Sequence, residues 1–196
     1  MNILSISDAA VALKDGFLFE NLDLGIDSGE RLGLVGKNGT GKTTLLRLIA
    51  GDLPADRGEM ARRRGLAVSI LEQMPAFGAD TTIAEFLYGG RAPEIALNDR
   101  ARRASGSQLA HLEKELDAYG PVPLENRYAA LCAELGLEDM NRLMSTMSGG
   151  EVKKAALART LSPKADLVLL DEPTNHLDLD TIEWLESRLL GAKFAF

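Results

Sequence analysis

The most constraining feature of this 196-residue sequence is a glycine-rich loop between an apolar segment and a helical pattern. Residues 36–43 read GKNGTGKT, which matches the complete pattern G-x-x-x-x-G-K-[ST]. The preceding residues 31–35 (RLGLV) are expected to form a compact apolar strand, and residues 42–50 a buried helix that ends at Gly51. The order strand, loop and helix predicts a phosphate-binding site in an α/β fold.

Each residue type in the loop has a physical task. Glycines let backbone N–H groups curl around phosphate oxygens without a clash from a Cβ atom. Lys42 is expected to contact the β- and γ-phosphates, the Thr43 hydroxyl to ligate Mg²⁺, and Thr44 to begin the packed helix. A chance match in a chain of this length is roughly a one-per-cent event, which favours the functional interpretation.

A second candidate element pairs two acidic residues with an apolar strand. Residues 167–170 (LVLL) are followed directly by Asp171 and Glu172, at the edge where open α/β sheets bind ligands. Asp171 is expected to hold Mg²⁺ and Glu172 to polarise the water that attacks the γ-phosphate. Alone, such a run more often marks a strand that meets solvent, but beside the glycine-rich loop the chemical interpretation prevails.

A third element places a serine and two glycines before a helix. Residues 147–151 read MSGGE, and capping alone would explain Ser148. Gly149 and Gly150 expose further backbone donors at a helix N-terminus, which makes a second phosphate-binding surface. One nucleotide needs only one such surface. We therefore expect residues 148–150 to serve a nucleotide held by another domain, in a composite site.

The rest of the chain supplies the context of these elements. Residues 2–13 and 17–26 alternate like antiparallel strands, residues 66–71 and 166–170 read as further strands, and residues 81–161 are mostly helical. Residues 179–190 also have helical spacing.

Charge and composition exclude several classes of protein. A net charge of −7 argues against a surface that traps nucleic acid or anionic lipid as a whole, although a local basic patch stays open. No apolar run approaches the ~18 residues of a membrane span, and the N-terminal residues MNILSISDAA have no basic region or long apolar stretch of a signal peptide, so we expect no membrane insertion. The single Cys132 cannot form an internal bridge, which indicates a reducing cytoplasmic setting.

Taken together, these motifs resemble an ABC ATPase nucleotide-binding domain over essentially the whole chain. Residues 170–178 (LDEPTNHLD) further resemble the ABC-F group, soluble tandem-ABC proteins that include ribosome-associated translation factors, and residues 112–137 are most similar to the first ABC domain of its Uup-like branch. The implied fold is α/β, a P-loop NTPase core with an antiparallel β-subdomain. A helical subdomain is expected over about residues 76–162 of a single domain 1–196.

The resemblance also implies the site residues. It implies Glu172 as catalytic base, with Lys42 and Gln73 as further catalytic residues, and Thr43, Gln73 and Asp171 around Mg²⁺. Residues implied to contact ATP, either in this domain or across a composite site, are Gly36, Asn38, Gly39, Gly41, Lys42, Thr43, Thr44, Ser148, Gly149, Gly150 and Asp178.

Three departures from the family pattern lead to expectations of their own. Glu151 stands where glutamine is usual and is expected to weaken nucleotide binding across the composite site. Leu13 occupies the place of the adenine-stacking aromatic, for which Phe17 is the alternative, so adenine affinity is expected to be modest. Family members also continue into a strand that ends in a switch histidine, which His176 cannot replace. The chain thus reads as an N-terminal ABC domain truncated before that histidine, and in isolation it is expected to be inactive.

The resemblance implies an ATP-hydrolysing half of a cytoplasmic tandem ABC protein. Its partner would be a second ABC domain, normally in the same chain, or another copy arranged head to tail. The implied targets are the ribosome with its rRNA or branched DNA. Two alternatives stay open at this point: the nucleotide-binding subunit of an ABC membrane transporter, and a clamp that binds ATP without hydrolysing it.

Overall fold

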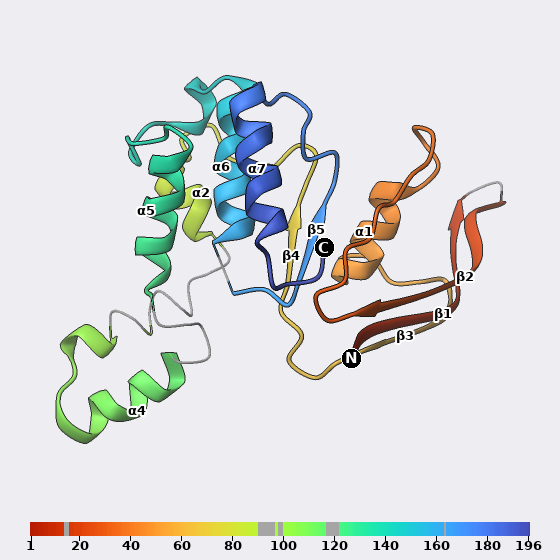
Figure 1. The fold of residues 1–196 in the computed structure, drawn as a ribbon, viewed down its shortest axis with the longest axis horizontal. Helices are drawn as coiled ribbons and strands as arrows, with labels where there is room; N and C mark the ends of the chain where they lie inside the picture. Colours follow the sequence, from red (N-terminus) through yellow and green to blue (C-terminus); the bar gives the residue numbers. More distant parts are fainter. Residues whose placement is uncertain (14–15, 90–96, 98–99, 117–121, 163) are drawn as a thin grey trace. The chain divides into compact units, whose positions relative to one another are not determined.

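The computed structural model describes residues 1–13, 16–89, 97, 100–116, 122–162 and 164–196. These residues form two compact units (Figure 1). The first consists of Met1–Gln73, Ala165–Pro173 and Glu186–Phe196, and the second of Met74–Lys164 and Thr174–Leu185. Each unit is described by itself below.

The first unit contains an antiparallel sheet of three strands in the order β2-β1-β3. Strand β1 spans Asn2–Leu13 and pairs with β2, Gly16–Asp27, as the alternation of the sequence predicts. Strand β3, Arg57–Arg62, pairs with the other edge of β1 and was not predicted. Its residues RGEMAR are almost all exposed, so they lack the apolar alternation that marks a half-buried strand.

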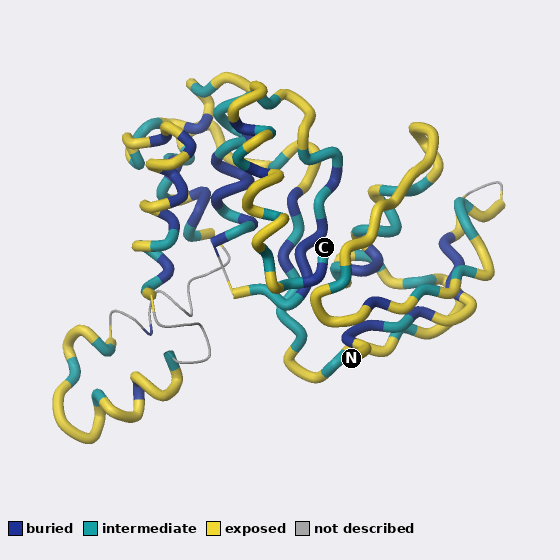
Figure 2. The backbone as a smooth tube through the Cα atoms, in the orientation of Figure 1, coloured by how far each residue is buried: buried dark blue, intermediate teal, exposed yellow. Residues whose placement is uncertain are grey.

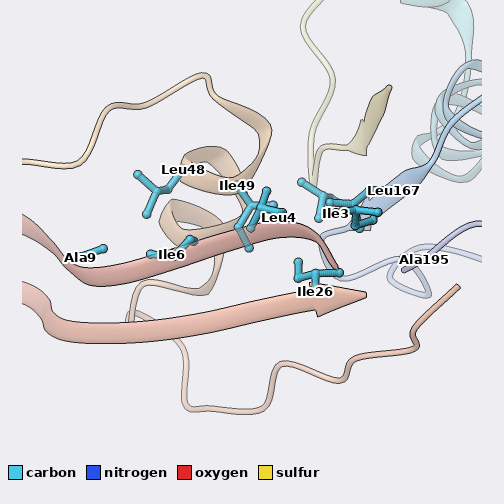
Figure 3. Packing of buried hydrophobic residues seen from close by; sticks show 10 residues of the cluster. Ile3, Leu4, Ile6, Ala9, Ile26, Leu48, Ile49, Leu167 and Ala195 are labelled. Carbon is cyan, nitrogen blue, oxygen red and sulfur yellow. The ribbon is translucent and has the colours of Figure 1, made fainter. Parts of the chain in front are cut away.

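A parallel pair and one helix complete the core of this unit. Strands β4, Val68–Leu71, and β5, Leu167–Leu170, pair in parallel and confirm two predicted strands with slightly shorter bounds. Helix α1, Lys42–Ala50, confirms the predicted helix and ends at Gly51. Figure 3 shows how side chains of α1 and β5 meet those of β1 and β2 in one cluster. Its buried members include Ile3, Leu4, Ile6, Ile26, Leu48, Ile49, Leu167 and Leu169.

The strand expected at residues 31–35 is not formed, and that prediction was wrong. The Leu32 N–H donates to the Phe196 carbonyl at 2.7 Å, and the Phe196 N–H donates to the Glu30 carbonyl at 2.9 Å. In the part of the chain that the structure describes, we find no further ladder bonds for residues 33–35. The apolar side chains are correspondingly open, with Val35 94% exposed. An apolar run becomes a strand only where a neighbour accepts its backbone bonds.

A pocket of about 560 Å³ lies beside this segment within the first unit. Leu32 and Leu34 line it together with α1 side chains, and β5 contributes Leu167–Leu170. Ala195 is bonded to β5 on the edge away from β4, where the Val168 N–H donates to the Ala195 carbonyl at 2.8 Å. The apolar wall of the pocket continues to Asp171 and Glu172, so it borders the carboxylates that end β5.

The C-terminus of α1 is closed by an arginine from β3. The Arg62 guanidinium donates to the carbonyls of Ile49 at 2.7 Å and of Leu48 and Ala50 at 3.2 Å. Gly51 follows with φ 91°, and a Cβ atom there would lie 2.6 Å from Arg62 Nη1. A cation at the last carbonyls of a helix stabilises it through the helix dipole. Arg62 is therefore a structural cap of α1.

We expect Gly51→Ala to destabilise the chain more than Gly65→Ala. Both glycines have positive φ, 91° and 72°, so each substitution costs about 1 to 2 kcal/mol of backbone strain. Only at Gly51 does the new methyl group displace Arg62 from the carbonyls, whereas at Gly65 nothing lies within 4 Å. This should cost about 1 kcal/mol more. Urea unfolding of the two variants measures the difference, and equal losses would show that Arg62 does not stabilise α1.

The second unit is mainly helical, as expected for residues 81–161. Its helices are α2, Ile83–Tyr88, α4, Gly106–Leu116, α5, Leu124–Glu134, α6, Gly149–Leu161, and the first part of α7, Leu179–Leu190. Figure 2 shows buried positions along α5 and α6. Leu124, Tyr128 and Leu157 are among the buried residues of these helices. Among the helices that the structure describes, none combines the length and apolarity needed to cross a bilayer.

Candidate nucleotide-binding site

The N-terminus of α1 is open toward the glycine-rich loop. Its N-cap residue is Gly41, and in the described structure no side chain accepts a hydrogen bond there. By contrast, Thr82 caps α2 and Ser148 caps α6, each through a complete capping box. The first N–H groups of a helix need partners. In α1, the glycine-rich loop leaves these donors available to an anion.

Lys42 lies over the same loop. Its ammonium donates to the Gly36 carbonyl at 2.8 Å and to the Lys37 carbonyl at 2.9 Å. The Thr40 hydroxyl also donates to the Lys37 carbonyl, at 2.9 Å. An ammonium has three N–H donors, so it can bind the loop and still donate to a phosphate oxygen. The positive charge is thus held where the loop can present it.

The end of β5 meets α1 at a pair of oxygen groups. The Thr43 hydroxyl donates to Asp171 Oδ2 at 2.7 Å, and the Asp171 side chain is almost completely buried. The Asp171 N–H donates to the Leu71 carbonyl at 3.1 Å, which fixes the carboxylate to the parallel sheet. Two of the three expected magnesium ligands are therefore in contact.

This donor set fits Mg²⁺. Magnesium prefers hard oxygen ligands and is commonly held by one or two carboxylates together with substrate phosphates and water. Among the described residues, no group of three or more His, Cys, Asp or Glu could form a metal cage of protein ligands alone. Thr43 and Asp171 thus suit an ion that arrives with a nucleotide.

Glu172 and Gln73 also lie in contact in the first unit. The Gln73 side-chain amide donates to Glu172 Oε2 at 2.8 Å. Glu172 has φ 44°, in the left-handed region that non-glycine residues rarely adopt. Backbone strain of this kind concentrates at functional sites. The structure thus brings five expected site residues of the first unit into contacts: Lys42 with its loop, Thr43 with Asp171, and Gln73 with Glu172.

The remaining expected site residues belong to the second unit. Residues 148–150 lie at the N-terminus of α6, and Asp178 lies before α7. Asp178 Oδ1 accepts the Thr181 N–H at 2.8 Å and Asp178 Oδ2 pairs with Lys154 Nζ at 2.8 Å. The hydrogen bond from Lys154 has the largest effect, followed by those from Thr181, and together they hold the pKa of Asp178 well below its usual range. Lys154 therefore ties α6 to the start of α7, a role that the sequence spacing did not reveal.

Gly150 approaches the loop before α7 closely. A Cβ atom at Gly150 would lie 2.9 Å from the His176 carbonyl oxygen. A glycine is needed here for packing as well as for any ligand, because a methyl group would push this backbone contact apart. The loop at residues 174–178 and the N-terminus of α6 thus fit together within the second unit.

The two candidates for stacking on adenine stand at the same hairpin. Leu13 pairs with Gly16 and Ala12 pairs with Phe17 across β1 and β2. Leu13 is 59% exposed and Phe17 is 51% exposed, so both side chains are accessible. The Arg57 guanidinium lies 5.8 Å from the centroid of the Phe17 ring. Phe17 therefore has the aromatic face that stacking requires and Leu13 has not.

Comparison with known proteins gives consistent results. Residues 19–175 match the family model described as ABC transporter. The chain is 35% identical over 96% of its length to YfmR, an ABC transporter ATP-binding protein of Bacillus subtilis, and 35% identical over 96% to the ATP-binding protein Uup of Escherichia coli. It covers 32% of YfmR and 31% of Uup, so the chain spans about a third of the length of these relatives.

Solved structures show the same fold. An ATP-binding subunit of an ABC transporter superposes with a TM-score of 0.69 at 22% identity, over 98% of this chain and 78% of that one. An inward-facing metal-chelate type ABC transporter superposes with a TM-score of 0.66 at 20% identity, over 99% and 71%. The glycine-rich loop, the carboxylates after β5 and the sequence relatives agree with the family model that covers residues 19–175: the chain belongs to the ABC transporter family and carries an ATP-binding domain of that family.

Proposed function

We propose that the first unit binds Mg·ATP and that this chain supplies one half of an ATP-hydrolysing pair of ABC domains. The observation that carries the proposal is the convergence of the open α1 N-terminus, Lys42, Thr43 and Asp171 in one unit. In this arrangement the N–H groups of the loop and α1 hold the phosphates, helped by Gly36, Asn38, Gly39, Gly41 and Thr44. Thr43, Asp171 and Gln73 would hold Mg²⁺, which neutralises phosphate charge when bound.

Glu172 is the proposed general base. Its carboxylate would accept the proton of the water that attacks the γ-phosphate, while Gln73 orients the carboxylate through the bond at 2.8 Å. Lys42 would stabilise the charge that develops on the phosphate oxygens. These roles need the side chains to move only within the first unit, where the structure already brings them into contact.

The second unit would complete the site of a partner domain. We propose that Ser148, Gly149, Gly150 and Asp178 face a nucleotide bound by a second ABC domain, either in the same chain or in another copy arranged head to tail. The length of the relatives supports the first arrangement, since this chain covers about a third of YfmR and of Uup. Either arrangement needs two copies of the domain for turnover.

We propose a cytoplasmic protein that acts on the ribosome or on branched DNA. The free thiol of Cys132 is compatible with a reducing setting, and burial, which raises its pKa to about 11, keeps it protonated and unreactive. Two arginines of the basic run at residues 62–64 are engaged within the chain. Arg62 caps α1, and Arg63 pairs with Asp166 at 2.6 Å. We therefore assign recognition of the target to other parts of the protein.

Cosedimentation tests the target. The full-length gene product carrying Glu172→Gln is mixed with ribosomes, or with labelled four-way DNA junctions, with and without ATP. We expect ATP-dependent binding to one of the two, at least tenfold above duplex DNA. Lys42→Ala in the same assay is the control for nucleotide dependence and should bind neither. Absence of ATP-dependent binding to both would contradict the proposed target, while leaving ATP binding itself to a separate titration.

A further inference from the structure

The capping box of α6 directs a carboxylate back over the residues that would meet a nucleotide. The Ser148 N–H and hydroxyl donate to Glu151 Oε2 at 2.8 and 2.9 Å, and the Glu151 N–H donates to the Ser148 hydroxyl at 3.3 Å. The N–H groups of Gly149 and Gly150 lie between these two residues. An anion at this helix end would therefore meet both backbone donors and a negative side chain.

An arginine from the preceding segment holds that carboxylate. Arg142 Nη1 donates to Glu151 Oε1 at 2.6 Å, and Nη2 donates to Glu151 Oε2 at 3.2 Å. The two side chains thus form a bidentate ion pair. Arg142 Nη2 also donates to the Thr146 carbonyl at 3.2 Å. The planar guanidinium group presents two parallel N–H donors to the two carboxylate oxygens. Such a bidentate pair is stronger than a single hydrogen bond between the same groups. Hydrogen bonds from Arg142, and then from Ser148, lower the pKa of Glu151 to about 2.

The backbone of Arg142 is itself fixed within the second unit. Its N–H donates to the Asp139 carbonyl at 3.1 Å, and its carbonyl accepts the Ile83 N–H of α2 at 3.0 Å. The guanidinium is thus presented from a segment bonded to another helix, while about a third of each of the two side chains stays exposed. A charge placed in this way neutralises Glu151 from the side of the preceding segment.

We propose that Arg142 is a positioning residue for the composite site: it neutralises Glu151 and holds it on the Ser148 cap, so that the α6 N-terminus can accept the terminal phosphate of a nucleotide bound by a partner domain. The inference rests on the proposed function. It replaces the expectation that Glu151 simply weakens the site, because the carboxylate comes with its own counter-ion.

The test measures ATP-dependent association of two kinds of chain. The acceptor carries Glu172→Gln and binds ATP; the donor carries Lys42→Ala and offers only its α6 N-terminus. Sedimentation of labelled acceptor gives the Kd for each donor in Mg·ATP. We expect Arg142→Ala in the donor to weaken association at least tenfold, about 1.4 kcal/mol. Adding Glu151→Gln, which keeps the capping box, should return the Kd to within about threefold.

Rescue separates neutralisation from a general structural role. An Arg142→Ala donor as tight as the unmodified donor, or a double variant as weak as Arg142→Ala, would overturn the proposal. Arg103→Ala removes an exposed arginine of the second unit and should leave the Kd unchanged. If Arg142→Ala does not give a folded chain by circular dichroism, Arg142→Gln takes its place with the same outcomes.

Failure of the Arg142 inference and failure of the proposed function give different results in this experiment. If the acceptor binds ATP but no donor associates with it, the α6 N-terminus does not accept a nucleotide in trans, and the role of Arg142 is overturned. If the acceptor does not bind ATP in a direct titration, the proposed function fails before Arg142 is tested.

Discussion

Glu172→Gln in the full-length gene product is expected to lower phosphate release at least about a hundredfold, the usual loss when a general base is removed. Mg·ATP affinity should stay within about twofold, which is only ~0.4 kcal/mol. The amide keeps the shape of the side chain and can still accept the bond that Gln73 donates at 2.8 Å. It cannot take a proton from water. Binding and turnover should therefore separate in this variant.

Single-turnover phosphate release, with protein in excess of ATP, measures the chemical step. Glu59→Gln is the matched control, because Glu59 is an exposed glutamate on β3 of the same unit. It should leave both affinity and rate unchanged. A Glu172→Gln variant that releases phosphate within about threefold of wild type would assign the base to another residue. ATP should also hold two such domains together for longer, since it is not consumed.

The elements that were predicted well carry their signals locally. Helix α1 is bounded by Gly41 and Gly51, and β5 is an apolar run that stops at Asp171, so the residues of each segment decide its limits. The contact of Thr43 with Asp171 follows from these two elements, because α1 begins directly after the glycine-rich loop and β5 ends at Asp171. The candidate site could thus be assembled from two short stretches 128 residues apart.

The elements that were missed depend on partners elsewhere in the chain. Residues 31–35 include the apolar Leu32, Leu34 and Val35, but only Glu30 and Leu32 share ladder bonds with Phe196, so no strand forms. Strand β3 forms because its backbone pairs with β1, and the sequence RGEMAR has no apolar alternation that would predict this pairing. Arg142 and Glu151 are separated by a turn of 3-10 helix, Met144–Thr146, and only the folded path brings their charges together. Spacing in the sequence could not reveal any of these pairings.

Lys42→Ala should produce the largest loss of nucleotide affinity of any single side-chain truncation. Its ammonium is held over the loop by the Gly36 and Lys37 carbonyls and would make a charge-assisted bond to phosphate. Removing such a bond costs about 1.5 to 3 kcal/mol, which corresponds to roughly a tenfold to hundredfold weaker Kd. The substitution leaves α1 intact, because alanine is a good helix former at its first position.

Lys37→Ala is a closely matched control for this variant. It removes the same type of side chain from the same exposed loop, and only the backbone carbonyl of Lys37 takes part in the bonds to Lys42 and Thr40. A general loss of positive charge would weaken binding equally in both variants. A specific phosphate contact would weaken it only in Lys42→Ala.

Equilibrium titration of the chain with a fluorescent ATP analogue and Mg²⁺ therefore tests the central claim, that the glycine-rich loop and α1 hold the nucleotide. The account predicts saturable binding by wild type, binding within about threefold by Lys37→Ala, and binding weakened at least about tenfold by Lys42→Ala. Equal affinity of wild type and Lys42→Ala, or equal losses in the two lysine variants, would contradict it.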